Sequence, residues 1–377
     1  RDCKALDSIT IPFSTLEIGR EVFSGCTGLG EVVLLSDGIK KIGMRTFREC
    51  SSLQSIAIPS SVDEIGQSAF NSCKELREVV LNEGLTSIVS CAFSGCLSLQ
   101  SIVIPSTVTK IGRHAFSYCN SLREVVLNEG LKKIGRNIFQ SCKTLQSITI
   151  PSTVDEIGMS TCNECNNLRT IVLKEGIKRI KEYAFRKCTS LQSITIPSSI
   201  NEIGLLAFHA CINLREVRLS ADVPKIKPNA FSRCPALERF LFPGISSRLE
   251  DIIQAGQVDA QNKIQQFMNQ SEIEWERGGT IRIPVQVTRR RGDGWGLVQQ
   301  HFRQIANWIK YYEIKEATTL FELALWKAKI DQEEDNIYER DCKKAKMNQA
   351  GDTDCRDRDL FRVDVPGPVK DAILQYL

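Results

Sequence analysis

The stretch from Ser52 to Cys73, SLQSIAIPSSVDEIGQSAFNSC, decides the fold because close copies of it return along the chain. One copy begins at Ser98 as SLQSIVIPSTVTKIGRHAFSYC, and another begins at Thr144 as TLQSITIPSTVDEIG. Self-similarity at a fixed spacing is the sequence signature of a repeat architecture. The chain is therefore best interpreted as a series of equivalent structural units.

Cysteines mark the spacing of these units. Eleven of them stand 23 residues apart, except for one step of 24 between Cys26 and Cys50. A leucine follows each cysteine by three residues, and a phenylalanine precedes most of them by three; Cys162 takes the phenylalanine position before Cys165. The eleven cysteines are Cys3, Cys26, Cys50, Cys73, Cys96, Cys119, Cys142, Cys165, Cys188, Cys211 and Cys234.

The chemistry of one unit predicts how it folds. The segment LQSIAIP alternates apolar and polar residues, which indicates a short strand with one face turned inward. Pro59 ends this strand because it has no N–H to donate. The segment QSAFNSC has room for no more than a helical turn, and we expect it to bury Phe70 and Cys73. One unit cannot cover these apolar groups, so neighbouring units must stack. We predict an α/β solenoid with one continuous parallel sheet of about eleven short strands, roughly 50 Å long.

The recurring skeleton L-x-x-I-x-I-P, I-G, A-F and C resembles the BspA-like class of leucine-rich repeats in both pattern and length. The resemblance covers residues 1 to about 242 and recurs eleven times. It implies a right-handed leucine-rich repeat solenoid and a habit of binding other macromolecules, and it transfers no catalytic residue. Departures are local: Val89, Lys181 and Lys227 replace the glycine of the I-G pair.

Composition narrows the class of protein. The chain has 377 residues with 42% hydrophobic content, which provides ample core material. No apolar run approaches the roughly 18 residues of a membrane span, so we expect no membrane insertion. The net charge of +4 is too small to indicate nucleic acid as a partner. Because the chain opens at Arg1 in mid-repeat, we expect a fragment of a longer protein, with a preceding signal peptide left open.

Fifteen cysteines raise the question of disulfides. Eleven belong to the repeat ladder, where a cysteine acts as a small buried hydrophobe. Disulfide scaffolds are typical of domains too small for a core, so we predict buried free thiols and favour a reducing, intracellular location over an extracellular one. The pair Cys162 and Cys165 forms a C-x-x-C, but no second pair stands nearby, and we expect neither a metal nor a cofactor.

The units also alternate in type, so that a block of 46 residues repeats. One type reads LQSI-x-IPS and the other LREVVLNEG. Stacked strands of a solenoid form an extended concave surface. On that surface an apolar stripe would be flanked by arginine and glutamate, which suits a protein partner. The residues that we expect to bind the partner are Arg77, Glu78, Val80, Val103, Arg123, Glu124, Val126, Arg169, Val172, Arg215, Glu216 and Arg218.

A simpler explanation of the alternation is duplication of a two-unit block. Alternation also separates the arginines, from about 4.8 Å to about 10 Å. This separation is favourable because like charges on adjacent strands are destabilising.

After residue 243 the repeat stops and the composition changes. Residues 244–377 predict a mainly helical C-terminal domain with a small hairpin, EIEWERGGTIRIPVQV, that turns at Gly278 and Gly279. The phrases IEWERGGTI, EATTLFELALWKAKID and VPGPVKDAILQYL resemble the C-terminal extension of uncharacterised diatom leucine-rich repeat proteins. We expect this domain to cap the open end of the solenoid, which would otherwise expose core.

The sequence favours a non-catalytic interaction module over two alternatives. The first alternative is an extracellular adhesin or receptor fragment that binds a surface protein or a glycan. The second is an enzyme with its site in residues 244–377. Against catalysis, His114, His209 and His301 have no nucleophile or carboxylate partner that their spacing suggests. No phosphate-binding glycine loop and no H-E-x-x-H is present.

Overall fold

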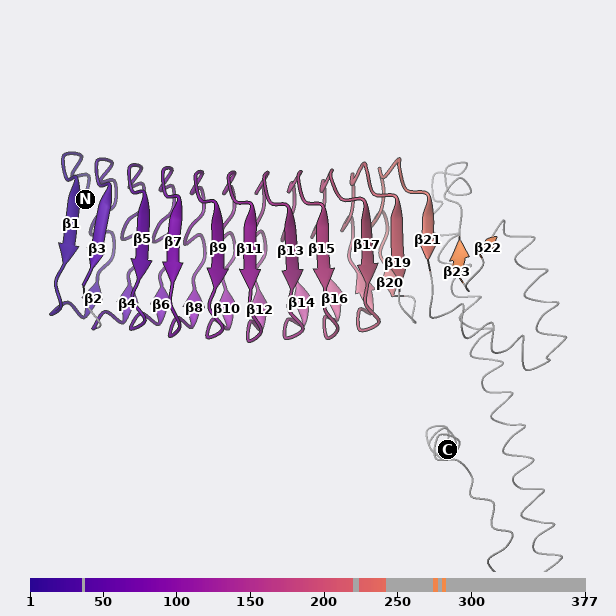
Figure 1. The fold of residues 1–377 in the computed structure, drawn as a ribbon, viewed down its shortest axis with the longest axis horizontal. Coiled ribbons are helices and arrows are strands. Elements are labelled where there is room, and N and C mark those ends of the chain that lie inside the picture. The colour runs from indigo at the N-terminus through magenta and orange to yellow at the C-terminus, as the bar shows by residue number, and fades with distance from the viewer. Residues whose placement is uncertain (36–37, 220–223, 242–273, 277–279, 283–377) are drawn as a thin grey trace, which may run out of the picture.

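The computed structural model describes residues 1–35, 38–219, 224–241, 274–276 and 280–282. In this part of the chain the fold is a parallel β-solenoid, in which each coil contributes one long and one short strand (Figure 1). The described residues contain no α-helix. The predicted repeat fold is therefore confirmed for the solenoid, whereas the predicted C-terminal helices fall outside the described residues.

The long strands form one layer and the short strands form a second layer (Figure 1). The long strands are β1 (Ser8–Ile11), β3 (Glu31–Leu34), β5 (Ser55–Ile58), β7 (Glu78–Leu81), β9 (Ser101–Ile104), β11 (Glu124–Leu127), β13 (Ser147–Ile150), β15 (Thr170–Leu173), β17 (Ser193–Ile196), β19 (Glu216–Leu219) and β21 (Arg239–Leu241). The short strands are β2 (Glu17–Ile18), β4 (Lys41–Ile42), β6 (Glu64–Ile65), β8 (Ser87–Ile88), β10 (Lys110–Ile111), β12 (Lys133–Ile134), β14 (Glu156–Ile157), β16 (Arg179–Ile180), β18 (Glu202–Ile203) and β20 (Lys225–Ile226).

The ladder of hydrogen bonds between long strands is not continuous, which corrects the expectation of one unbroken sheet. The strands β5 and β7 pair over four residues, and so do β9 and β11. The next steps, from β7 to β9 and from β11 to β13, carry no such pairing, although the strands remain neighbours (Figure 1). The long-strand layer is therefore assembled from two-coil blocks of 46 residues.

Proline explains the interruption. In the paired step from β1 to β3, the N–H of Leu35 donates to the carbonyl of Ile11 at 3.1 Å. The equivalent donor in the step from β3 to β5 is Pro59, which has no N–H. Only one residue pair joins these two strands. Prolines at the same position follow β9, β13 and β17. The final step, from β19 to β21, keeps three residue pairs.

The core consists of ladders of identical side chains. Phenylalanine rings of successive coils stack with centroids 5.1 Å apart between Phe70 and Phe93 and 5.8 Å apart between Phe116 and Phe139. The stack stops at Phe139 and resumes at Phe185, because Cys162 occupies the intervening position. Burial of each such side chain stabilises the fold by roughly 1.5–3 kcal/mol. These ladders bind neighbouring coils together along the whole solenoid.

The segment before each cysteine, which we call the phenylalanine turn (residues 67–73 and their equivalents), is not a helical turn. Two positions in each turn have left-handed backbone, as at Ser68 (φ 56°) and Ser72 (φ 62°). The N–H groups of Ser68, Phe70 and Ser72 donate to carbonyls of the next coil at 2.7–3.0 Å. In place of a helical turn, which was the most that the sequence allowed, this segment forms a third column of hydrogen bonds between coils. These bonds offset the cost of left-handed backbone at non-glycine residues.

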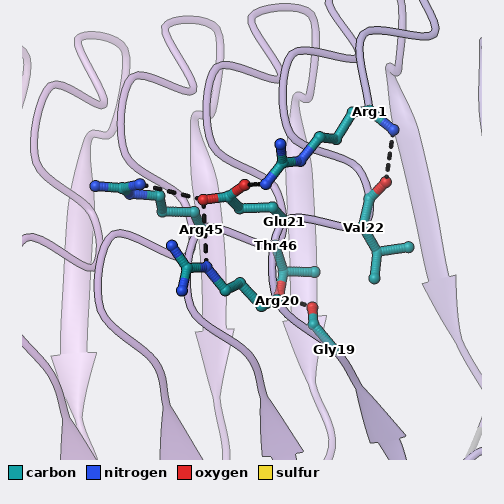
Figure 2. Close-up of polar contacts among 7 residues, drawn as sticks. All are labelled: Arg1, Gly19, Arg20, Glu21, Val22, Arg45 and Thr46. Atoms are coloured by element: carbon teal, nitrogen blue, oxygen red, sulfur yellow. Dashed lines mark hydrogen bonds and ion pairs between the residues drawn. The ribbon is translucent and has the colours of Figure 1, made fainter.

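A buried carboxylate joins the first coils (Figure 2). Glu21 is only 7% exposed, and its Oε1 lies 3.1 Å from Nη1 of Arg45 in the next coil. The guanidinium groups of Arg1 and Arg20 also pair with this carboxylate. The amino group of Arg1 donates to the carbonyl of Val22 at 3.1 Å. A buried charge needs such partners, so the cluster fixes the position of Glu21 between coils.

The predicted hairpin in the C-terminal region is confirmed. The strands β22 (Glu274–Glu276) and β23 (Thr280–Arg282) pair antiparallel, with Trp275 opposite Ile281. The strand β23 lies beside β21, at the C-terminal edge of the solenoid (Figure 1).

Candidate functional site

The outward side chains of β5 to β19, with the residue before each strand, form what we call the long-strand face. The structure brings the predicted partner-binding residues together on this face, because the side chains of a strand alternate between core and solvent. The exposed members of the predicted set are Arg77, Glu78, Val80, Val103, Arg123, Glu124, Arg169, Val172, Arg215 and Arg218.

The apolar stripe of this face is accessible. The side chains of Val80, Val103 and Val172 are 42%, 55% and 44% exposed, respectively, whereas Val126 is half-buried. A valine with this exposure contributes little to the core. The stripe therefore offers apolar area to solvent between two charged columns.

Glu216 differs from the other predicted partner-binding residues because it is buried. Glu216 is only 7% exposed, and its carboxylate pairs with Arg218 at 2.6 Å and with Arg239 at 2.7 Å. Both of its oxygens are thus occupied within the solenoid. Glu216 holds β19 to β21 and is not available to a partner in the way that Glu78 and Glu124 are.

The structure assigns a second role to the alternation, which the sequence analysis missed. The glutamate of each N-E-G or K-E-G segment accepts hydrogen bonds from the turn after the next coil's proline. Glu83 accepts from the backbone N–H of Ser106 at 3.1 Å and of Thr107 at 3.2 Å. In return, the Thr107 hydroxyl accepts from the N–H of Gly84 at 3.1 Å. We call this reciprocal arrangement the glutamate clamp.

The glutamate clamp recurs in two further blocks. Glu129 accepts from the hydroxyl of Ser152 at 3.0 Å, and Glu175 accepts from the N–H of Ser199 at 3.0 Å. The clamp joins coils at the steps where proline interrupts the strand ladder. A glutamate followed 23 residues later by serine is visible in the sequence, and could have identified it.

These contacts lower the pKa of the clamp glutamates. The ammonium of Lys174 and the hydroxyl of Ser152 lower the pKa of Glu129 to about 2. The N–H of Ser106 lowers the pKa of Glu83. Burial opposes the effect at Glu175, but the N–H groups of the next coil leave its pKa below the ordinary value. The carboxylates are therefore fully ionised at neutral pH.

The ladder cysteines are buried thiols, as predicted, with Cys3 as the exposed exception. From Cys50 to Cys234, each ladder thiol donates to the carbonyl of the residue in the phenylalanine position of an earlier coil; Cys73 to Phe47 measures 3.1 Å. Burial raises the pKa of Cys50 and Cys119 to about 12. No disulfide joins the thirteen cysteines of the described residues. These thiols are protonated and poorly nucleophilic, since only the thiolate reacts.

One of the two described histidines contacts a hydroxyl group, a partner that the sequence analysis did not identify. His209 Nδ1 lies 2.7 Å from the hydroxyl of Ser232. Burial lowers the pKa of His114 and of His209, and neighbouring arginines lower both further. Within residues 1–35, 38–219 and 224–241, no three His, Cys, Asp or Glu side chains are grouped to hold a metal ion. None of the described residues forms a helix that could cross a membrane.

Several solved structures contain proteins that are similar to this chain. No curated protein matches the sequence. Among solved structures, the chain is similar to a leucine-rich repeat protein of Bacteroides ovatus, with 27% identity over 63% of this chain and 79% of that one (TM-score 0.41). A leucine-rich cell surface protein of Faecalibacterium prausnitzii gives 28% identity over the same shares (TM-score 0.38). The pneumococcal vaccine antigen PcpA gives 25% identity over 63% and 62% (TM-score 0.47).

The family assignment comes from the repeats themselves. The family described as the BspA type leucine-rich repeat region matches residues 1–123 and 110–238, in six copies. The matched residues span the coils from β1 to β20, including the phenylalanine and cysteine ladders. This chain therefore belongs to the BspA-type leucine-rich repeat family.

Proposed function

We propose that this protein is a non-catalytic interaction module that binds a protein partner on its long-strand face. BspA-type leucine-rich repeat proteins are generally protein-binding or surface proteins. The observation that carries the proposal is the exposed stripe of Val80, Val103 and Val172 between charged columns. Protein interfaces combine an apolar centre with arginine-rich surroundings. The stripe and the columns supply both.

The spacing of the arginines supports an extended contact. Arg77, Arg123 and Arg169 stand on every second coil, so neighbouring guanidinium groups belong to strands about 10 Å apart. No described ion pair involves Arg123 or Arg169. Their guanidinium groups are free to form bidentate hydrogen bonds with carboxylates of a partner. The bound segment would then run along the solenoid axis.

Charge reversal tests the proposal. The full chain is used to capture partners from a lysate of its source, beside a variant with Arg77, Arg123, Arg169 and Arg215 changed to Glu. A matched control changes Lys40, Lys132, Lys178 and Lys225 to Glu; these exposed lysines directly precede or begin short strands, so the control alters the net charge equally in the other layer. We expect the first variant to lose the partner and the control to keep it.

A photo-crosslinking residue separates direct contact from an indirect effect. Placed at Val103 (55% exposed), it should attach to the captured partner; placed at Lys41, an exposed residue of the short strand β4, it should not. The residue at Lys41 serves as the negative control. Equal crosslinking at both positions, or capture that survives the arginine changes, would move the binding function away from the long-strand face.

A further inference from the structure

A groove of about 720 Å³ lies in the short-strand layer, on a different side of the solenoid from the long-strand face. Its lining includes the residues of β10 and β12. Its rim carries six cationic side chains against the carboxylates of Asp155 and Glu156. The cationic side chains are Lys110, Arg113, Lys132, Lys133, Lys178 and Arg179.

The charge pattern of the short strands changes at this groove. In the first three coils the outward residue alternates as Glu17, Lys41 and Glu64. At the groove, Lys110 lies directly opposite Lys133 in the parallel register. Like charges on directly opposed residues are destabilising. The two lysines at this position therefore cost stability.

The carboxylate that would neutralise Lys133 is engaged elsewhere. In the first coils, Nζ of Lys41 pairs with Glu64 of the following coil at 2.6 Å. The equivalent partner of Lys133 would be Glu156, but Glu156 pairs with Arg179 and with Lys181, the latter at 2.9 Å. Lys181 stands where most other coils carry glycine. Among the described residues, Lys110, Arg113, Lys132 and Lys133 form no ion pair.

The interruption of the short-strand ladder lies at the same place. The ladder runs from β2 to β12 and starts again at β14. Glu156 begins β14, so it lies across the interruption from Lys133. Lys110 and Lys133 therefore belong to one part of the short-strand ladder, and Asp155 and Glu156 lie at the start of the next.

A second hollow of about 660 Å³ adjoins the groove, and Arg113 lines both. Arg136 and His114 line this second hollow. After burial, Arg113 and Arg136 are the next causes of the lowered pKa of His114, which is consistent with their lying close to it. Positive charge thus extends over two adjacent coils.

We propose that this groove binds a small polyanion that carries two or more phosphate groups. The volume falls within the range of small-molecule sites. Each phosphate group presents close to two charges and several acceptor oxygens, and lysine and arginine both bind it well. Lys110 and Lys133 stand on neighbouring strands, about 4.8 Å apart, so they can hold two adjacent phosphate groups. A long nucleic acid fits less well, because the carboxylates of Asp155 and Glu156 lie among the cations of the groove.

Calorimetric titration of the full chain with inorganic tripolyphosphate tests this proposal, at low ionic strength where attraction is least screened. We expect binding that weakens at least about tenfold in the variant Lys110→Gln/Lys133→Gln, since hydrogen bonds to charged groups are the stronger kind. The same double change at Lys41 and Lys225, in coils outside the groove, should alter the Kd by less than about twofold. Glu156→Gln should tighten binding, because it removes negative charge from the rim.

Thermal unfolding of every variant verifies that the fold is intact, and the Lys110 and Lys133 changes should slightly raise the unfolding temperature. The proposal is overturned if tripolyphosphate does not bind, or if both double variants weaken binding equally. Inorganic sulfate binding as tightly as tripolyphosphate would contradict a site for multiply phosphorylated ligands. A thymidine oligonucleotide that binds more tightly, through the same lysines, would assign the groove to single-stranded nucleic acid instead.

Discussion

The carboxylate of Glu83 accepts the backbone N–H of Ser106 at 3.1 Å, across the step where the strand ladder between their coils is absent. At these steps, where the long-strand ladder is missing, side chains add to the backbone hydrogen bonds that the short strands and the phenylalanine turns make between coils. The alternation of unit types is thus a structural requirement as well as a pattern on the surface.

Removing the clamps should weaken the junctions between blocks. We expect the triple variant Glu83→Gln, Glu129→Gln and Glu175→Gln to lower the unfolding temperature by about 2–4 °C, the usual consequence of losing a few exposed hydrogen bonds in a chain of this size. Differential scanning calorimetry measures the change. As a control, Glu75→Gln, Glu78→Gln and Glu124→Gln remove the same charge from exposed glutamates outside the clamps. An equal loss in both triple variants would assign the effect to net charge alone.

Acid should protonate the clamp carboxylates and so weaken the hydrogen bonds that they accept. The pKa of Glu129 in the folded protein is about 2, below its ordinary value of 4.5. A lowered pKa means that the stabilisation is present above pH 4.5 and is lost as the pH falls towards 2. Unfolding temperatures of the wild-type chain and of Glu129→Gln should converge over this window. A difference between them that stays constant from neutral pH down to pH 2 would contradict the clamp.

The phenylalanine ladder should be the most sensitive part of the core. Phe93 is fully buried and stacks on Phe70 at 5.1 Å and on Phe116 at 5.4 Å. Phe93→Ala should lower the free energy of unfolding by about 3–5 kcal/mol, because it leaves a cavity between two rings. Val80→Ala, on the exposed stripe, should change it by less than about 0.5 kcal/mol. Denaturant unfolding compares the two, and similar costs would mean that the stripe is part of the core.

Thiol reactivity should follow burial. A thiol reagent at neutral pH should label Cys3 first and Cys91 more slowly, while Cys50 and Cys119, with a pKa of about 12, stay protected until the chain unfolds. Mass spectrometry of labelled peptides identifies the order among these four. Rapid labelling of Cys119 in the folded protein would show that the ladder opens locally.

The sequence alone predicts the structure of one coil, but it does not predict the contacts that join successive coils. Strands, buried leucines and the cysteine ladder follow from local alternation and from a strict 23-residue spacing, so a single unit predicts them. The interrupted ladder depends on how Pro59 aligns with Leu34 of the preceding coil, which requires the register between strands. The burial of Glu216 likewise depends on Arg239 in the next coil, although its position within β19 resembles that of the exposed Glu124.

The backbone of the phenylalanine turn was missed for a different reason. Its left-handed positions are filled by ordinary residues such as Tyr183 and Leu206, which rarely adopt that conformation. Stacking enforces it: the N–H of Tyr183, for example, donates to the carbonyl of Leu205 in the following coil at 3.0 Å. Because the neighbouring coils impose this left-handed conformation, the residue types in the turn do not reveal it.

The phenylalanine turns give the solenoid a polarity. In each, N–H groups point towards the following coil and carbonyls towards the preceding one, as Ser72 donates to Ser94. Two solenoids of this kind can continue each other only head to tail, since any other end-to-end contact sets like dipoles face to face. Such contacts join two different surfaces, so when repeated they build rings or filaments rather than two-fold dimers.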